Sequence, residues 1–68
     1  MTLKAIIHKE SVGGFWGEVP SLPGCYSQGE TVAELLANLR EAAQGCLAVL
    51  REEGRVPEPE VEVTELAV

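Results

Sequence analysis

Three side chains in this sequence are of types that commonly carry out nucleophilic or metal chemistry: His8, Cys25 and Cys46. A structural zinc site needs four such ligands, usually with closely spaced cysteine pairs, and this chain has no C-x-x-C motif. A nucleophilic cysteine needs a basic neighbour that lowers its pKa, and Cys25 has none beside it in sequence. We therefore expect two reduced, structural thiols and no metal site.

Glutamates are the other candidates for catalysis, since all eleven acidic residues are glutamate. Metal-dependent nucleases of the RNase H type gather several carboxylates on one face of a sheet, and Glu18 and Glu62 are the two that predicted strands would carry. The absence of aspartate weakens this interpretation. Gly13 and Gly14 belong to neither GxxxxGK[ST] nor GxGxxG, so they form no phosphate loop. We expect no catalytic residue and no cofactor.

The net charge of −6 indicates which partners the chain suits. Nucleic-acid binding needs a basic surface, and the five Lys and Arg residues are scattered along the sequence. An acidic chain of this size fits a basic protein partner, or the charge serves only solubility. Neither a secretory signal nor an apolar run of membrane-spanning length is visible, so we expect a cytoplasmic protein.

The stretch richest in turn-forming residues is EVPSLPGCYSQGET, residues 18–31. Pro20 lacks an N–H group and ends the strand that precedes it. Pro23 and Gly24 suit the two central positions of a type II turn, the second of which needs a positive φ. Residues 25–28 then predict a short strand. The pattern favours a structural corner over an active-site loop.

Two strands are predicted before this corner. Residues 2–8 and residues 15–19 both show the alternation of a half-buried strand. Between them, Gly13 and Gly14 supply the positive φ angles that a hairpin loop needs. The two strands should therefore pair antiparallel.

One long helix is predicted over residues 32–53. Thr31 is a typical N-cap residue, and Glu34 completes a capping box. Gly54 suits the position just after the helix, and Pro57 prevents its continuation. An arc of roughly 120° carries the apolar side chains expected to face the sheet: Val32, Leu35, Leu36, Leu39, Ala43, Cys46, Leu47 and Leu50.

Residues 61–68 alternate again and predict a last strand, in which Val61, Val63 and Glu65 share a face. The order β-β-β-α-β describes an α+β fold, a small antiparallel sheet with one long helix packed on one face. A chain of 68 residues is marginally stable as a monomer. We therefore expect a homodimer or a higher homo-oligomer.

Two sets of residues are candidates for contacts with other molecules. Gly45 lies on the helix face opposite the core, where glycine costs about 1 kcal/mol relative to alanine. Close approach of a partner would explain it, and a tolerated glycine on a solvated acidic face is the alternative. The possible partner contacts are Glu34, Glu41, Gly45 and Glu52. Trp16 and Tyr26 are possible dimer contacts or core residues on one face of the sheet.

The order of corner, cap and helix resembles the HicB-type antitoxin domain over about residues 3 to 66. In that family a strand ending in proline is followed by a P-x-L-P-G-C corner, a short strand, a G-[DE]-[ST] helix start and a long amphipathic helix. The matching positions in this sequence are Pro20, Leu22, Pro23, Gly24, Cys25, Gly29, Glu30, Thr31 and Glu34.

The resemblance implies a partial RNase H-like domain that dimerises and blocks a HicA-like toxin, a small basic ribonuclease. It implies no enzymatic activity for the antitoxin itself. Full HicB antitoxins carry a further C-terminal DNA-binding segment, whereas here we expect a single HicB-like domain over residues 1–68, without direct nucleic-acid binding. Two alternatives remain: a stand-alone homo-oligomer that binds a small molecule or another protein, and the metal-dependent nuclease.

Overall fold

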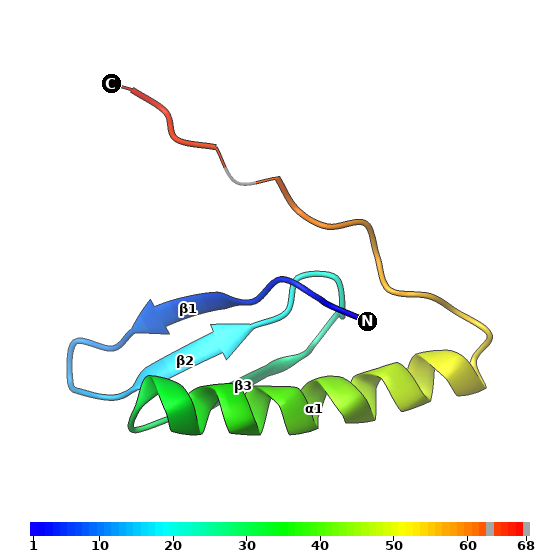
Figure 1. Cartoon of the computed structure of the whole chain (residues 1–68), viewed down its shortest axis with the longest axis horizontal. Helices are drawn as coiled ribbons and strands as arrows, with labels where there is room; N and C mark the ends of the chain where they lie inside the picture. The colour runs from blue at the N-terminus through cyan, green and yellow to red at the C-terminus, as the bar shows by residue number, and fades with distance from the viewer. Residues whose placement is uncertain (63, 68) are drawn as a thin grey trace.

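The computed structural model describes residues 1–62 and 64–67. Three strands are followed by one helix: β1 (Ile6–Lys9), β2 (Phe15–Glu18), β3 (Tyr26–Gly29) and α1 (Val32–Glu52). The sheet forms one layer and α1 the other (Figure 1). The predicted α+β arrangement, an antiparallel sheet followed by one long helix, is confirmed.

β2 is the central strand of the sheet and pairs antiparallel with β1 on one side and with β3 on the other. In the loop between β1 and β2, the Glu10 N–H donates to the Gly14 carbonyl (3.1 Å) and the Gly13 N–H donates to the Glu10 carbonyl (3.2 Å). Both glycines have the positive φ expected of this hairpin, 103° at Gly13 and 81° at Gly14.

Both ends of α1 are capped by the residues that the sequence predicts. The Glu34 N–H donates to Thr31 Oγ1 at 3.1 Å, which satisfies one backbone donor of the first turn. After α1, Gly54 has a φ of 68°, and the Arg55 N–H donates to the Leu50 carbonyl at 2.8 Å. This is a Schellman motif, which satisfies the last carbonyls of the helix. Within the described residues, no helix is both long enough and apolar enough to cross a membrane.

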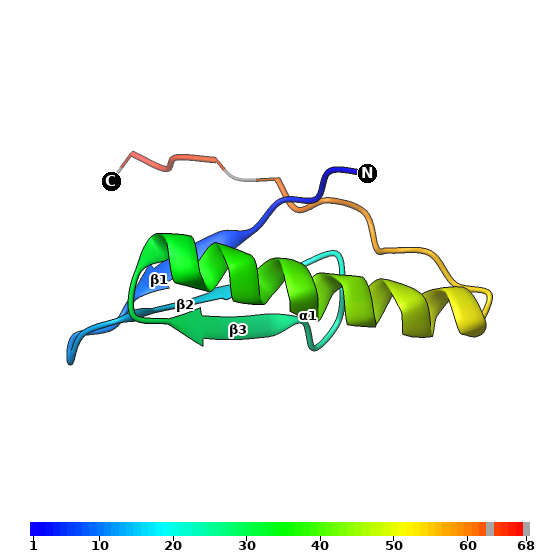
Figure 2. The same cartoon turned by 60° about the horizontal axis from the view of Figure 1, so that its bottom comes forward.

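One face of the sheet is covered by α1, which packs across β3 and β2 (Figure 2). Gly17 points toward α1, because a Cβ atom on it would lie 3.3 Å from Leu35 Cδ2. Asn38 Nδ2 on α1 also donates to the Gln28 carbonyl on β3 at 2.9 Å. Side chains alternate along a strand, so Trp16 and Glu18 point to the opposite, uncovered face.

The core lies between α1 and the corner that follows β2. Its buried apolar side chains are Val19, Leu22, Cys25, Leu35, Leu39 and Leu50. Two residues of the predicted core stripe depart from it, since Val32 is 42% exposed and Leu36 is 47% exposed. The reason is the position of α1, which lies over β3 and β2 and leaves this side of its apolar stripe without a strand beneath it.

The last predicted strand is the other departure. Residues 61, 62 and 64–66 belong to no strand, and Val63 lies outside the described residues. The chain passes the start of β1 and then runs away from the body (Figure 1). A strand needs a neighbouring strand to satisfy its backbone groups, and alternation in the sequence does not supply one.

Candidate functional site

Residues 19–25, which connect β2 to β3, form a tight corner that buries Val19, Ser21, Leu22 and Cys25. The Cys25 N–H donates to the Leu22 carbonyl at 3.0 Å, and Gly24 has a φ of 78°, as the predicted type II turn requires. The Val19 N–H donates to the Cys25 carbonyl at 3.0 Å and closes the corner. Because Leu22 is buried in the core cluster together with Leu39 and Leu50, it packs the corner against α1.

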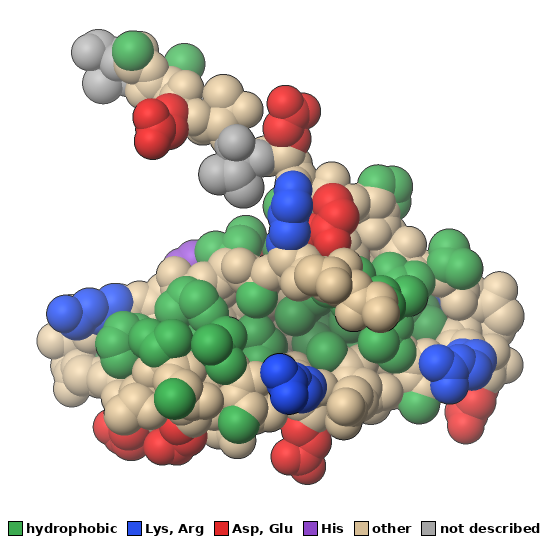
Figure 3. Space-filling view, viewed as in Figure 1, with side chains coloured by type: hydrophobic (Ala, Val, Ile, Leu, Met, Phe, Trp, Pro, Cys, Tyr) green, Lys and Arg blue, Asp and Glu red, His purple; other side chains and the backbone are tan. Residues whose placement is uncertain are grey.

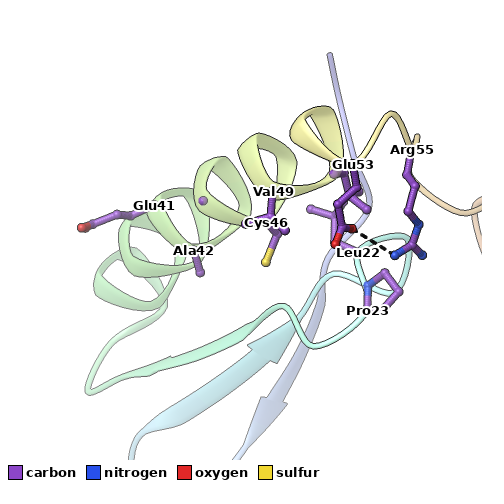
Figure 4. A pocket seen from close by; sticks show the side chains of 10 residues that line it. Leu22, Pro23, Glu41, Ala42, Cys46, Val49, Glu53 and Arg55 are labelled. Carbon is purple, nitrogen blue, oxygen red and sulfur yellow. Dashed lines mark hydrogen bonds and ion pairs between the residues drawn. The ribbon is translucent and has the colours of Figure 1, made fainter.

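A groove of about 520 Å³ separates this corner from the second half of α1 (Figure 4). Leu22 and Pro23 form the wall on the corner side. The other wall is mostly apolar and consists of Ala42, Gly45, Cys46, Val49 and Leu50. The volume is within the usual range of small-molecule pockets and of sites for a few inserted side chains.

Gly45 lines the groove at the middle of α1. A Cβ atom placed on Gly45 would have no other atom within 4 Å, so the fold itself does not require glycine here. The absence of a side chain exposes the helix backbone to whatever enters the groove. Gly45 therefore marks a place where another molecule can approach α1 closely.

Three charged side chains stand at the rim of the groove. Arg55 Nη1 lies 3.3 Å from Glu53 Oε1, so these two charges largely offset each other. Among the described residues, Glu41 takes part in no ion pair. The charge that the groove presents to a partner is therefore negative and centred on Glu41 (Figure 4).

The two cysteines meet at the base of this region, although they are far apart in sequence. Both thiols are free; Cys25 is buried, and the half-buried Cys46 packs against the same core cluster. Burial, together with a hydrogen bond to the Cys46 side chain, raises the pKa of Cys25 to about 11. Cys25 is therefore a protonated thiol at neutral pH and a poor nucleophile.

A family assignment follows from the sequence as a whole. Residues 3–67 match the family described as the HicB_like antitoxin of bacterial toxin-antitoxin systems. The chain belongs to the HicB-like antitoxin family. Its fold and its corner-cap-helix order are thus those of a HicB-like domain, as the resemblance implied.

Relatives of this HicB-like chain include several UPF0150 proteins. One from Synechocystis sp. is 50% identical over 42 residues, which make up 62% of this chain and 61% of that protein. One from Thermoplasma acidophilum is 39% identical over 51 residues, 75% of this chain and 74% of that protein. The chain spans about three fifths of the length of the first Synechocystis relatives that it matches.

Two solved structures share the fold. TTHA0281 from Thermus thermophilus superposes with a TM-score of 0.71 at 29% identity, over 90% of this chain and 82% of that one. A chain of the HicA3 and HicB3 toxin-antitoxin complex superposes with a TM-score of 0.68 at 31% identity, over 90% of this chain and 72% of that one.

The HicB-like scaffold separates the four predicted partner contacts. Glu41 and Gly45 both line the groove. Glu34 lies instead beside a polar hollow next to the β1–β2 hairpin, and Glu52 ends α1 outside the groove. The structure therefore brings two of the four residues together in one site.

Trp16 and Tyr26 share the sheet face opposite α1. The register places Trp16 opposite Gln28 and Tyr26 opposite Glu18, which sets all four side chains on that face. Trp16 stacks on His8, with ring centroids 4.0 Å apart, whereas Tyr26 is 69% exposed. A dimer contact through these residues stays a prediction.

The two glutamates considered for metal-dependent cleavage are not brought to one sheet face. Glu18 lies on β2, and Glu62 lies in no strand. In the described part of the chain, no three His, Cys or Glu side chains are grouped so that they could hold a metal ion. The arrangement therefore lends no support to the nuclease alternative.

The sequence reasoning missed the groove and the contact between the two thiols. One signal for the groove was available, because Ala42 and Val49 lie three and four residues from Gly45 and so share its side of α1. No comparable signal linked Cys25 to Cys46, whose contact depends on how α1 lies against the corner.

Proposed function

We propose that this chain is a non-enzymatic antitoxin-type module that binds and neutralises a small basic HicA-like ribonuclease. Membership of the HicB-like family supports an antitoxin role. The structural neighbour in the HicA3 and HicB3 complex supports a toxin as the class of partner. The binding site that we propose is the groove between α1 and the corner.

The observation that carries the proposal is the combination of an apolar groove, an exposed helix backbone at Gly45 and a carboxylate at Glu41 that forms no ion pair with the described residues. Burial of apolar side chains in a pocket supplies most of the affinity of protein interfaces. Gly45 leaves room for a partner side chain to approach the backbone of α1 closely. Glu41 favours a partner segment that carries Lys or Arg beside its apolar side chain.

The net charge of the whole chain also favours a basic partner. The net charge is −6, and Glu34, Glu41 and Glu52 are all exposed on one side of α1. A negative surface of this kind speeds the approach of a basic protein and orients it before contact. Glu34 and Glu52 would then contribute to association without lying in the groove.

A calorimetric titration with a HicA-like toxin from the source organism tests the proposal. We expect saturable binding, protection of RNA from the toxin, and an affinity that falls about tenfold when monovalent salt rises from about 50 to about 300 mM. The chain alone should leave the same RNA intact. Failure to bind the toxin at low ionic strength would overturn the proposal.

A second candidate is a small-molecule site in the same groove, which its volume and apolar lining favour. A ligand of this kind would carry an apolar body and one cationic group near Glu41. A thermal-shift screen of such compounds in the absence of toxin tests this candidate. A small-molecule site predicts compounds that raise the melting temperature of the unaltered chain but not that of Gly45→Leu, whereas a site for toxin alone predicts none.

A further inference from the structure

The two thiols at the base of the groove differ in their access to solvent. Cys25 belongs to the corner and is 3% exposed, whereas Cys46 is half-buried and lines the groove. Figure 4 shows the Cys46 side chain directed from α1 toward the space between the helix and the corner. In the space-filling view of Figure 3, hydrophobic side chains cover much of the visible face of the molecule. A small reagent in the groove can therefore reach Cys46 before it reaches Cys25.

The two thiols are also close enough to interact directly. Cys46 packs against the core cluster that contains Cys25, and the two side chains affect each other's protonation. The backbone holds both residues in place, because the N–H and the carbonyl of Cys25 are bonded within the corner and Cys46 lies inside α1. A disulfide requires its two sulfurs to come about 2 Å apart. From the contact in the folded chain, movements of the two side chains can bring the sulfurs to that distance.

An accessible thiol with a second thiol beside it is the arrangement of cysteine pairs that respond to oxidants. The accessible thiol is oxidised first, and the second one converts the product to a disulfide before further oxidation occurs. The pair is not part of a metal site, since no third ligand joins it among the described residues. The chemistry that the two residues support is therefore the reversible exchange between two thiols and one disulfide.

We propose that Cys25 and Cys46 form a redox-active pair that a small hydroperoxide converts to a disulfide. The Cys46 thiolate attacks the peroxide, so that an S–O bond forms, the O–O bond breaks and the leaving oxygen takes up a proton. The sulfur of Cys25 then attacks the sulfenic acid on Cys46. The S–S bond forms, the S–O bond breaks, and the hydroxyl leaves as water with the proton of Cys25. In total, the two thiols lose two electrons, and the hydroperoxide accepts them and becomes an alcohol or water.

The disulfide joins the corner to α1 covalently. It closes a loop of about 20 residues, which contains β3 and the first part of α1. A cross-link of this size restricts the unfolded chain and so stabilises the folded one. In the reduced chain, packing alone holds the corner against this part of α1. The oxidation state of the pair therefore determines how firmly the two walls of the groove are joined, whatever molecule enters the groove.

Mass spectrometry of the unaltered chain tests the pair directly. The reduced chain is treated with hydrogen peroxide at neutral pH, the remaining thiols are blocked, and the product is digested with trypsin. We expect peptides 10–40 and 41–51, which contain Cys25 and Cys46, to be joined within one chain, with a loss of about 2 Da for two hydrogen atoms. Dithiothreitol should separate the two peptides. Unchanged thiols, thiols that only gain oxygen, or disulfides only between chains would overturn the proposal.

Two single variants test the order of the two steps. Cys25→Ala leaves Cys46 without its partner, so the sulfenic acid on Cys46 should persist and react with dimedone. Cys46→Ala leaves only the buried thiol, which dimedone should label at least about tenfold more slowly under the same peroxide treatment. Equal rates of labelling in the two folded variants would contradict Cys46 as the first thiol to be oxidised.

Thermal denaturation measures the effect of the disulfide on the fold. The oxidised chain should melt at least about 10 °C above the reduced chain, and dithiothreitol should reverse the shift. Cys46→Ala is the matched control, because it receives the same peroxide treatment but cannot form the bond, and its melting temperature should not rise. An oxidised unaltered chain that melts at or below the temperature of the reduced chain would show that the bond does not hold the corner to α1.

Discussion

The backbone nitrogen of Leu35 lies 2.6 Å from the point that a Cβ atom on Gly29 would occupy. The end of β3 and the start of α1 are thus in direct backbone contact, and no flexible side chain lies between them to move aside. A side chain at position 29 has to push α1 off the sheet. Glycine at this position of the family motif is therefore required by packing.

Gly29→Ala should lower the free energy of unfolding by on the order of 3 kcal/mol, because the backbone of α1 has to shift. Urea denaturation followed by circular dichroism measures the change. Gly45→Ala is the matched control, since its new Cβ atom meets open space and the chain should gain about 1 kcal/mol of helix stability. A Gly29→Ala variant as stable as the unaltered chain would contradict this account of the contact.

Because the pKa of the buried Cys25 thiol is raised, we expect the chain to lose stability at alkaline pH. Its pKa is 9.0 in its ordinary state and about 11 in the folded chain, so between these values the folded state holds the proton that the unfolded state releases. The contribution of Cys25 to the free energy of unfolding should therefore be constant below pH 9. It should fall by about 2 to 3 kcal/mol as the pH rises to 11.

The pH dependence is measured as the difference between variants, so that contributions from groups other than Cys25 cancel. Cys25→Ala should be less stable overall but lose less stability between pH 9 and 11. Val19→Ala removes a buried side chain that does not titrate, and should keep the slope of the unaltered chain. Equal slopes for all three chains would exclude the buried thiol as the cause.

The hydroxyl of Thr31 caps α1 and should contribute about 1 kcal/mol to stability. Thr31→Ala removes the acceptor for the Glu34 N–H and should lower the free energy of unfolding by that amount. Thr31→Asn restores an acceptor at the same position and should recover most of the loss. Thermal denaturation of the three chains measures these differences. If Thr31→Ala has the same melting temperature as the unaltered chain, the Thr31 hydroxyl does not stabilise α1.

Features that depend on a few neighbouring residues could be predicted from the sequence. Thr31 with Glu34, Pro23 with Gly24, and the hairpin glycines each determine the backbone within about four residues, and the structure has them as expected. These local signals determine where the strands and the helix begin and end along the chain. They were sufficient for the α+β class.

The remaining features depend on where α1 lies across the sheet, which no local pattern specifies. Leu36 belongs to the same apolar stripe as Leu39, yet only Leu39 is buried, because the strands beneath α1 are β3 and β2. The same placement opens the groove on one flank and brings Cys46 to Cys25. Residues 61, 62 and 64–66 show the converse case, a strand-like sequence that pairs with none of the described strands.

The central claim, that a toxin enters the groove over Gly45, is tested most directly by filling the groove from within. Gly45→Leu adds a side chain where the structure has open space, so the chain should remain folded with unchanged or higher stability. Gln44→Leu adds a similar apolar side chain about 100° around α1, outside the groove, and is the matched control.

We would titrate both variants with the HicA-like toxin under conditions in which the unaltered chain binds. The account predicts that Gly45→Leu weakens binding at least tenfold, about 1.4 kcal/mol, whereas Gln44→Leu binds within about twofold of the unaltered chain. If the folded Gly45→Leu variant binds the toxin as tightly as Gln44→Leu does, the groove is not the toxin site.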